Sequence, residues 1–317
     1  QHIKEDVLYL SGNTMMISGF DTLTCDSMVY WSKLDSGYAV GNVRYIQSDN
    51  KREITTDVFH YWQTEGYRGS SFIADGFTRI IENGRLISAN KIIYNDDLQL
   101  MNLFSNASIE DASRGLLGDQ IEIKYMDSIL ETVTIDKKAF AYNNLDIRVE
   151  YDGPSQKFRD EMSSSSMFAI FKDEKISKLN LYNMASTLYH VVDDSLLAGI
   201  NNVSGDTIGI YFSFDDMKRL EVKGGAKGEF EPEGDNTRID TTIFYGAEYI
   251  DYHIDERSSF LSKKAFLKYE NTELNSGNIL INWDTNILDA SSLGNELPAI
   301  KTKGESPMTG HNMVFDL

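Results

Sequence analysis

The side chains that could do chemistry are few and scattered in this sequence. The chain has five histidines, and only Asp251-x-His253-x-Asp255 places three potential metal ligands on one face of a strand. A solvated strand face explains that spacing without a metal. Acidic pairs such as Asp96-Asp97 cannot act together as acid and base, because adjacent residues of a strand point to opposite faces. We therefore predict no catalytic residue, no bound metal and no cofactor.

Motifs and charge argue in the same direction. The sequence has no Gly-x-Ser-x-Gly elbow, no His-Glu-x-x-His and no phosphate-binding Walker loop. Its single cysteine, Cys25, occupies a place that Thr56 and Ser88 take in related segments, which is typical of a small packed side chain rather than a nucleophile. Thirty basic residues against 49 acidic ones give a formal net charge of −19, which repels nucleic acid. We expect a protein that is not an enzyme and binds no nucleic acid.

The elements that carry these residues are predicted to be strands. The chain has only four prolines against 23 glycines, a balance that favours tight β connections. Apolar residues alternate with polar or small ones at a period of two in segments such as 23–30, 120–125 and 206–212. Helical periodicity is confined to 156–161 and 214–220, which are too short to organise a core. The sequence indicates an all-β fold.

An internal repeat organises these strands. Leu23-x-x-Asp26-x-Met28-x-Tyr30 matches Ile54-x-x-Asp57-x-Phe59-x-Tyr61, and the same frame begins again at residues 86, 116, 203 and 274. Between these segments a Gly, Asn or Lys precedes a small or apolar residue, as in Asn13-Thr14, Asn42-Val43, Gly76-Phe77, Asn106-Ala107, Lys138-Ala139, Gly225-Ala226 and Lys264-Ala265. A unit of roughly 30 residues with two short strands cannot bury its own apolar face, so successive units must stack. We expect an elongated molecule.

The repeat divides the chain into sections. We predict amino-terminal repeats over 1–150 and carboxy-terminal repeats over 176–290. A loop or boundary is expected over 151–175, where Asp152-Gly-Pro154 and the four serines 163–166 interrupt the pattern. The residues 291–317 show no clear repeat, and we expect an irregular tail there.

The order and spacing of these motifs resemble those of a known family. Gly41-Asn42-Val43, followed by Ile54-x-x-Asp57 and Phe59-x-Tyr61, is similar to the alternating strands of the OstA-like proteins of lipopolysaccharide transport, which include the periplasmic part of the outer-membrane assembly protein. Residues 176–233 resemble the longer members of the Bacteroidota type. The resemblance covers residues 7–290.

The resemblance implies a fold and a function. It implies a V-shaped, slit-like β-jellyroll whose apolar interior holds acyl chains, and an end-to-end bridge formed with other OstA-like proteins by strand pairing. It also implies lipopolysaccharide or a similar acylated lipid as partner, and a periplasmic protein associated with the outer membrane, whose signal peptide precedes Gln1. The alternation nominates as lipid-contacting residues Met28, Val43, Phe59, Phe77, Leu103, Ala107, Ile109, Ile121, Ile123, Ile208, Ile210, Ala226, Ala265, Ile279 and Ile281.

Two other hypotheses fit the same residues. One is a structural or adhesive β-solenoid with a packed core and no ligand. The other is a polysaccharide-acting β-helix enzyme, for which Asp26, Asp57 and Asp119 are the only acidic ladder in register, although their places beside turns favour a capping role. An apolar slit would favour lipid transport, whereas a filled core would favour the solenoid.

Overall fold

The described part of the chain is built from strands. The computed structural model describes residues 2–4, 6–19, 21–47, 51–63, 70–193, 195–214, 216–233 and 239–316. Within these residues there is no α-helix, and so none that could cross a membrane. This all-β architecture confirms the fold class that the period-two pattern predicts. The chain divides into two compact units, residues 1–139 with 170–174 (unit 1) and residues 140–169 with 175–317 (unit 2).

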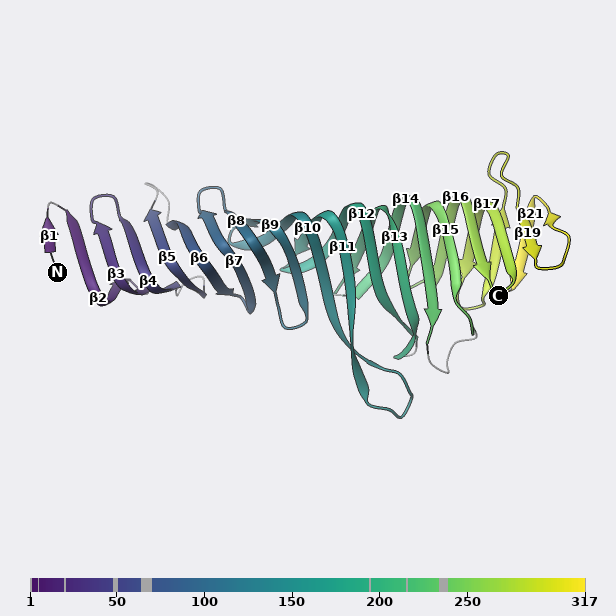
Figure 1. The fold of residues 1–317 in the computed structure, drawn as a ribbon, viewed down its shortest axis with the longest axis horizontal. Helices are drawn as coiled ribbons and strands as arrows, with labels where there is room; N and C mark the ends of the chain where they lie inside the picture. Colours follow the sequence, from purple (N-terminus) through teal and green to yellow (C-terminus); the bar gives the residue numbers. More distant parts are fainter. Residues whose placement is uncertain are drawn as a thin grey trace. The chain divides into compact units, whose positions relative to one another are not determined.

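Unit 1 is a series of antiparallel strands that follow one another in chain order (Figure 1). Each of β2–β8 pairs with its neighbours in the chain. The strands are β1 (His2–Lys4), β2 (Val7–Ser18), β3 (Asp21–Trp31), β4 (Ser36–Gln47), β5 (Arg52–Gln63), β6 (Ser70–Glu82), β7 (Arg85–Asn95), β8 (Leu100–Glu110), β9 (Arg114–Met126) and the first part of β10 (Ile129–Arg148).

Unit 2 repeats this arrangement with longer strands. They are the rest of β10, most of β11 (Ser155–Lys172), then β12 (Lys175–Asp193), β13 (Leu196–Ser213), β14 (Asp216–Pro232), β15 (Ile243–His253), β16 (Ser258–Tyr269), β17 (Thr272–Asn282), β18 (Ile287–Ser291), β19 (Ala299–Thr302), β20 (Met308–Thr309) and β21 (Asn312–Asp316). Strands β12 to β17 pair antiparallel with their neighbours in the chain, and Arg148 of β10 makes a parallel contact with Leu196 of β13.

A corner interrupts each long strand pair. The register shifts where the even-numbered strands carry residues with positive φ, between 47° and 95°. These residues are Gly12–Asn13, Gly41–Asn42, Gly76, Ser105–Asn106, Lys137–Lys138, Asn183–Met184, Gly224–Gly225 and Lys263–Lys264. Extra residues in one strand bend it and exchange its two faces. The Gly, Asn and Lys motifs of the repeat are therefore the corners of the fold.

An acidic side chain from the odd-numbered strand lies against several corners. Asp26 accepts a hydrogen bond from Nδ2 of Asn42 at 3.0 Å, and Asp119 pairs with Nζ of Lys138. A Cβ at Gly41 would stand 2.3 Å from Oδ2 of Asp26, so this position requires glycine for space as well as for φ. The aspartate ladder thus serves the corners in the structure, and does not form a shared acidic site.

Each corner divides its strand into two halves that bury one face. In β5, Ile54 precedes the corner and Phe59 follows it, and both are 0% exposed. They are five residues apart, and in a regular strand residues an odd number apart point to opposite faces. The shift of register at the corner lets both point inward. We call the halves that contain residues 7–11 of β2 and 58–63 of β5 arm A of unit 1. The halves that contain 14–18 of β2 and 52–56 of β5 form arm B.

Two expectations about chain organisation are wrong. Residues 151–175 are not a loop, because Ser155–Lys172 forms β11. The four serines 163–166 lie between the buried Met162 and Met167, at an odd spacing, and so occupy the place of a corner in that strand. Residues 291–317 are not an irregular tail, because β19 pairs with one half of β17 and β21 pairs with β18.

Candidate functional site

The interior of unit 1 lies between its two arms. Tyr61, in arm A of β5, directs its hydroxyl to Sδ of Met16, in arm B of β2, at 3.6 Å. The ring of Tyr45, in arm B, lies 5.4 Å from the ring of Phe59, in arm A. Both contacts join a residue of arm A to a residue of arm B, so the inner faces of the two arms oppose one another. The backbone ladders run along each arm, and these contacts across the interior are made by side chains.

Aromatic rings follow one another along arm A. Ring centroids are 5.3 Å apart between Phe59 and Phe72, 5.4 Å between Phe72 and Tyr94, and 6.3 Å between Tyr94 and Tyr125. Such spacings are those of favourable aromatic pairs. The ring series lies on β5, β6, β7 and β9, so one continuous apolar wall extends across successive strands of the unit.

A buried ion pair closes the edge of this interior, which we call the rim. Arg52 of β5 donates to Oε1 of Glu82 of β6 at 2.8 Å, and their side chains are only 5% and 8% exposed. Both residues belong to arm B, and arm A covers them. The guanidinium carbon of Arg52 lies 4.8 Å from the ring centre of Tyr94, and Tyr125 donates its hydroxyl to Oε2 of Glu82 at 3.2 Å. Side chains, rather than backbone pairing, join the arms here.

The charges at the rim are strongly held. Burial lowers the pKa of Arg52, but the adjacent Glu82 carboxylate together with Tyr125 and Tyr94 raises it by more, so Arg52 remains a cation. Burial raises the pKa of the Tyr94 hydroxyl to about 12, and burial also raises that of Tyr125. Both tyrosines are therefore neutral hydrogen-bond donors at physiological pH.

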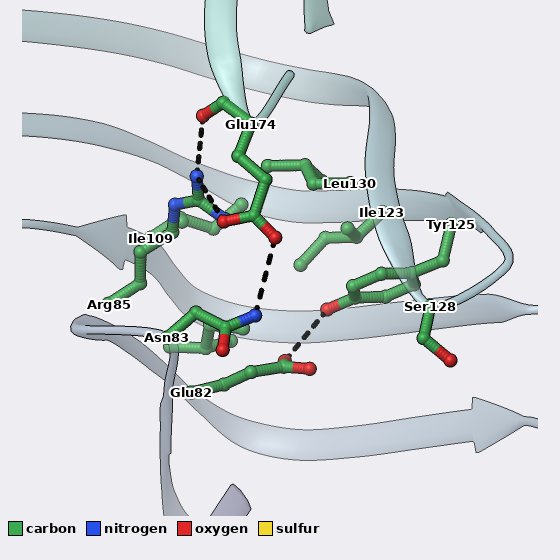
Figure 2. A pocket seen from close by; sticks show the side chains of 10 residues that line it. Glu82, Asn83, Arg85, Ile109, Ile123, Tyr125, Ser128, Leu130 and Glu174 are labelled. Carbon is green, nitrogen blue, oxygen red and sulfur yellow. Dashed lines mark hydrogen bonds and ion pairs between the residues drawn. The ribbon is translucent and has the colours of Figure 1, made fainter. Parts of the chain in front are cut away.

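A small pocket opens beside this ion pair (Figure 2). Its cavity volume is about 10 Å³, space for about one water molecule. Arg85 donates to the backbone carbonyl of Glu174 at 2.6 Å and lies 3.8 Å from its carboxylate, and Asn83 donates to that carboxylate at 3.4 Å. Aliphatic side chains line the inner wall of the pocket, namely Ile87, Ile109, Ile123 and Leu130. The pocket is thus the place where the apolar interior meets a charged rim.

Fourteen of the fifteen nominated lipid-contacting residues are buried, at 0–6% exposure. Eight lie in unit 1, namely Met28, Val43, Phe59, Leu103, Ala107, Ile109, Ile121 and Ile123. Six lie in unit 2, namely Ile208, Ile210, Ala226, Ala265, Ile279 and Ile281. Residues with 0% exposure, such as Phe59, touch no water-sized space. The interior is therefore filled by its own side chains around them.

The fifteenth nominated residue, Phe77, is on the wrong face. It is 61% exposed, whereas the next residue, Thr78, is fully buried. The pairing of β6 with β7 passes over Gly76 and Phe77, just as the pairing of β4 with β5 passes over Gly41 and Asn42. Phe77 is thus the counterpart of Asn42, and Thr78 takes the inward place.

Unit 2 has an interior of the same kind, bridged by a polar network. Asn201 donates to the hydroxyl of Tyr189 at 2.7 Å and accepts from the hydroxyl of Tyr245 at 2.7 Å. The rings of Tyr189 and Tyr252 are 6.3 Å apart. Arg257 makes two hydrogen bonds to Asp193, at 2.8 and 3.0 Å. These contacts satisfy buried polar groups and fix the strand ends.

The residues that suggested chemistry in the sequence have structural partners. Asp251 takes two hydrogen bonds from Arg219, at 2.7 and 2.8 Å, and Asp255 accepts one from Lys218 at 3.0 Å. In the described residues no three His, Cys, Asp or Glu side chains are placed to hold a metal ion. Cys25 is buried, and burial raises the pKa of its thiol, which disfavours the reactive thiolate.

Arg52 and Glu82 are not among the candidate residues predicted from the sequence, although the sequence does carry a signal for them. Arg52 stands two residues before the inward Ile54, and Glu82 stands two residues after the inward Ile80. Charges that continue the inward period of a strand must be buried or must lie at its rim. Their opposite signs on paired strands point to an ion pair. Glu174 could not be found in this way, because its contact with Arg85 joins distant parts of the chain.

No family model matches the chain, and no curated protein matches it. Among solved structures, the chain is similar to LptH of Pseudomonas aeruginosa, described as the LptA-homologous periplasmic component of the lipopolysaccharide transport device. The sequence identity is 12%, the TM-score is 0.34, and the similarity covers 50% of this chain and 94% of LptH.

Proposed function

We propose that the chain is a lipid carrier or bridge of the periplasm, which holds the acyl chains of lipopolysaccharide or a similar lipid between the arms of unit 1. One observation carries this proposal: an apolar interior runs across successive strands, and side chains close it at the rim. Arms joined by side chains can part without breaking the backbone ladders within each arm. The resemblance of the sequence motifs to OstA-like proteins supports the same function.

The energies are compatible with such an opening. Separating the arms breaks hydrogen bonds such as that from Tyr125 to Glu82, each worth about 1–3 kcal/mol, and the contact between Arg52 and Tyr94, worth about 0.5–2 kcal/mol. An acyl chain between the arms replaces the apolar contacts that the arms lose to each other. It also buries its own hydrocarbon, which contributes about 0.8 kcal/mol for each CH₂. A chain of ten carbons therefore outweighs several rim contacts.

Photo-crosslinking tests this proposal. A diazirine amino acid of similar volume is placed at Phe59 or at Ile121, both of which are fully buried, and the protein is irradiated with lipopolysaccharide. The control position is Lys124, which neighbours Ile123 but points outward, with its side chain 55% exposed. We expect lipid adducts at positions 59 and 121 and none at position 124.

A second function, that of a packed structural or adhesive scaffold, is favoured by one observation. The protein's own side chains bury the fourteen inward residues to 0–6% exposure. This function predicts no adduct at any of the three positions. It also predicts that an added lipid leaves the stability of the protein unchanged, whereas a ligand bound to the native state raises it.

A further inference from the structure

We propose that the rim of unit 1 is an anion-binding gate, at which the phosphate group of an acylated lipid replaces the carboxylate of Glu174 on Arg85 and then reaches Arg52. This inference rests on the proposed function and specifies the headgroup of the lipid. The ligand it requires has a phosphate group attached to acyl chains.

Arg52 has donors that the protein does not use. Its Nη2 donates to Glu82, but its buried Nε–H has no hydrogen-bond partner in the described structure. A guanidinium presents five N–H groups in a planar fork that matches phosphate oxygens two at a time. A buried donor without a partner is unfavourable, and a bound anion would remove that cost. The unsatisfied Nε–H therefore points to a ligand with more acceptor oxygens than Glu82 supplies.

The carboxylate of Glu174 is held more weakly than the Arg52–Glu82 pair. Its oxygens lie 3.8 Å from Arg85 and 3.4 Å from Asn83, beyond the usual length of a charge-assisted hydrogen bond. Asp173 and Glu174 form the turn of a hairpin, with φ of 51° and 61°, and the side chain of Glu174 is 39% exposed. This carboxylate can turn out to solvent while the backbone carbonyl of Glu174 keeps its bond to Arg85.

The pocket has a polar end and an apolar wall, which match the headgroup and the hydrocarbon of an amphiphilic ligand. Arg85, Asn83 and Ser128 lie at its rim, and its inner wall is aliphatic, including Ile109 and Ile123. These isoleucines line the same pocket as Arg85 and Glu174 (Figure 2). A headgroup at Arg85 would place the first carbons of its acyl chains against this wall, which continues into the interior.

The charge of the chain distinguishes a lipid phosphate from a free one. A net charge of −19 repels anions from solution. Inorganic phosphate has no hydrocarbon with which to offset that repulsion or the cost of opening the rim. Acyl chains supply the missing free energy, so the gate selects phosphate that is attached to them.

The test compares ligands that differ only in the phosphate. The full chain is titrated with dioctanoyl phosphatidic acid, with dioctanoylglycerol in the same non-ionic micelles, and with inorganic phosphate, by calorimetry. The variants are R85Q, E174Q and R52K, with R79Q as a charge-matched control on the outer face of β6. Circular dichroism checks that each variant is folded.

The expected results follow from the roles of these residues. The wild-type protein and R79Q should prefer the phosphatidic acid over the neutral lipid by about tenfold, as one charge-assisted contact predicts. E174Q should increase this preference, because it removes the competing carboxylate. R85Q should abolish it, and R52K should reduce it, because lysine keeps the charge but loses the fork.

Three outcomes would overturn the gate. Equal binding of both lipids, unchanged in R85Q, would refute the anion gate and leave lipid binding intact. Binding of neither lipid would refute both the gate and the proposed function. Binding of inorganic phosphate as tight as that of the phosphatidic acid would show a site for free anions rather than for a lipid headgroup.

Discussion

The buried ion pair of Arg52 and Glu82 has to be interpreted together with the groups that surround it. Arg52 and Glu82 lie at the inner edge of an apolar interior, where each would be costly alone. The ring of Tyr94 and the hydroxyl of Tyr125 complete their surroundings. A hydrophobic pair would close the rim equally well, so stability alone does not explain this arrangement. Unlike a hydrophobic pair, it places a cation with an unpartnered Nε–H at the edge of the apolar interior.

Removing one member of this pair should be strongly destabilising. The variant R52M leaves the Glu82 carboxylate buried without its partner, and we expect a loss of about 3–5 kcal/mol in the free energy of unfolding. Urea unfolding measures this loss. The double variant R52M/E82M should recover much of it, because no unpaired charge remains. The exposed control R79Q should stay within about 0.5 kcal/mol of wild type. A loss in R52M no larger than that in R79Q would contradict the role of the pair.

Asp251 predicts a pH dependence with a defined sign. Burial raises the pKa of this carboxyl, but the hydrogen bonds from Arg219 lower it by more, so its pKa lies below the usual value. A carboxylate with a lowered pKa in the native state stabilises the protein above about pH 4, its ordinary pKa in the unfolded chain, and loses that contribution as the pH falls through the native value.

The variant D251N should therefore be less stable than wild type at pH 6, and the difference should shrink as the pH falls toward 2. Chemical unfolding at a series of pH values measures this. The exposed Asp289 of β18 provides the control, D289N, whose stability should follow that of wild type. A stability difference for D251N that does not change between pH 6 and pH 2 would exclude the ion pair as its cause.

At the scale of the element, the corner is the defining feature. Gly41 and Gly84 both have a φ of 77°, but only Gly41 faces a neighbour, since a Cβ there would meet Asp26 and nothing lies within 4 Å at Gly84. The two glycines therefore separate the cost of backbone strain from the cost of a steric clash.

We expect G84A to lower the free energy of unfolding by about 1 kcal/mol, which is the cost of a left-handed alanine. G41A should lower it by about 1–3 kcal/mol more, because the methyl group displaces the carboxylate of Asp26. The double variant G41A/D26A removes the clash and should behave like G84A. Urea unfolding of the three variants measures these differences. Equal losses in G41A and G84A would show that the corner imposes no steric requirement.

The strands could be predicted from the sequence, and the Gly, Asn and Lys motifs mark where the corners lie. The register shifts at the corners and the late pairings could not be predicted. Period-two alternation is a local property, and it places residues such as Ile54 and Phe59 correctly on the buried face. A corner shifts that alternation, so the assignment of Phe77 failed by one residue. The serines of β11 gave no apolar signal, and β19 and β21 depend on pairing with distant strands, which composition does not reveal.

The candidate site was only half predictable for the same reason. Its apolar wall follows from alternation, and the inward charges Arg52 and Glu82 continue that period. The contacts across the interior do not follow from it, because they join arm B of β5 and β6 to arm A of β7 and β9. Which strands of the two arms face each other depends on the register shifts at the corners. These shifts cannot be predicted from a local sequence pattern.

For the molecule as a whole, an excess of acidic charge contrasts with the single buried cation of the described residues, Arg52. With 49 acidic and 30 basic residues, the chain repels anionic ligands over distances of about 10 Å, the screening length in roughly 0.1 M salt. The Arg52 guanidinium is shielded from added ions by its burial. Salt should therefore weaken the long-range repulsion more than it weakens a contact with the buried arginine.

This balance predicts an unusual salt dependence for lipid binding. Raising ionic strength from about 10 mM to about 150 mM should increase the affinity for dioctanoyl phosphatidic acid several-fold, because the screening length falls from about 30 Å to about 8 Å. Most arginine–phosphate contacts at exposed sites weaken with salt instead. Dioctanoylglycerol, which carries no charge, provides the control and should change little. Calorimetric titrations at four salt concentrations measure both lipids. If the affinity for the phosphatidic acid falls with salt, its phosphate is bound by exposed cations, and the buried Arg52 is not its partner.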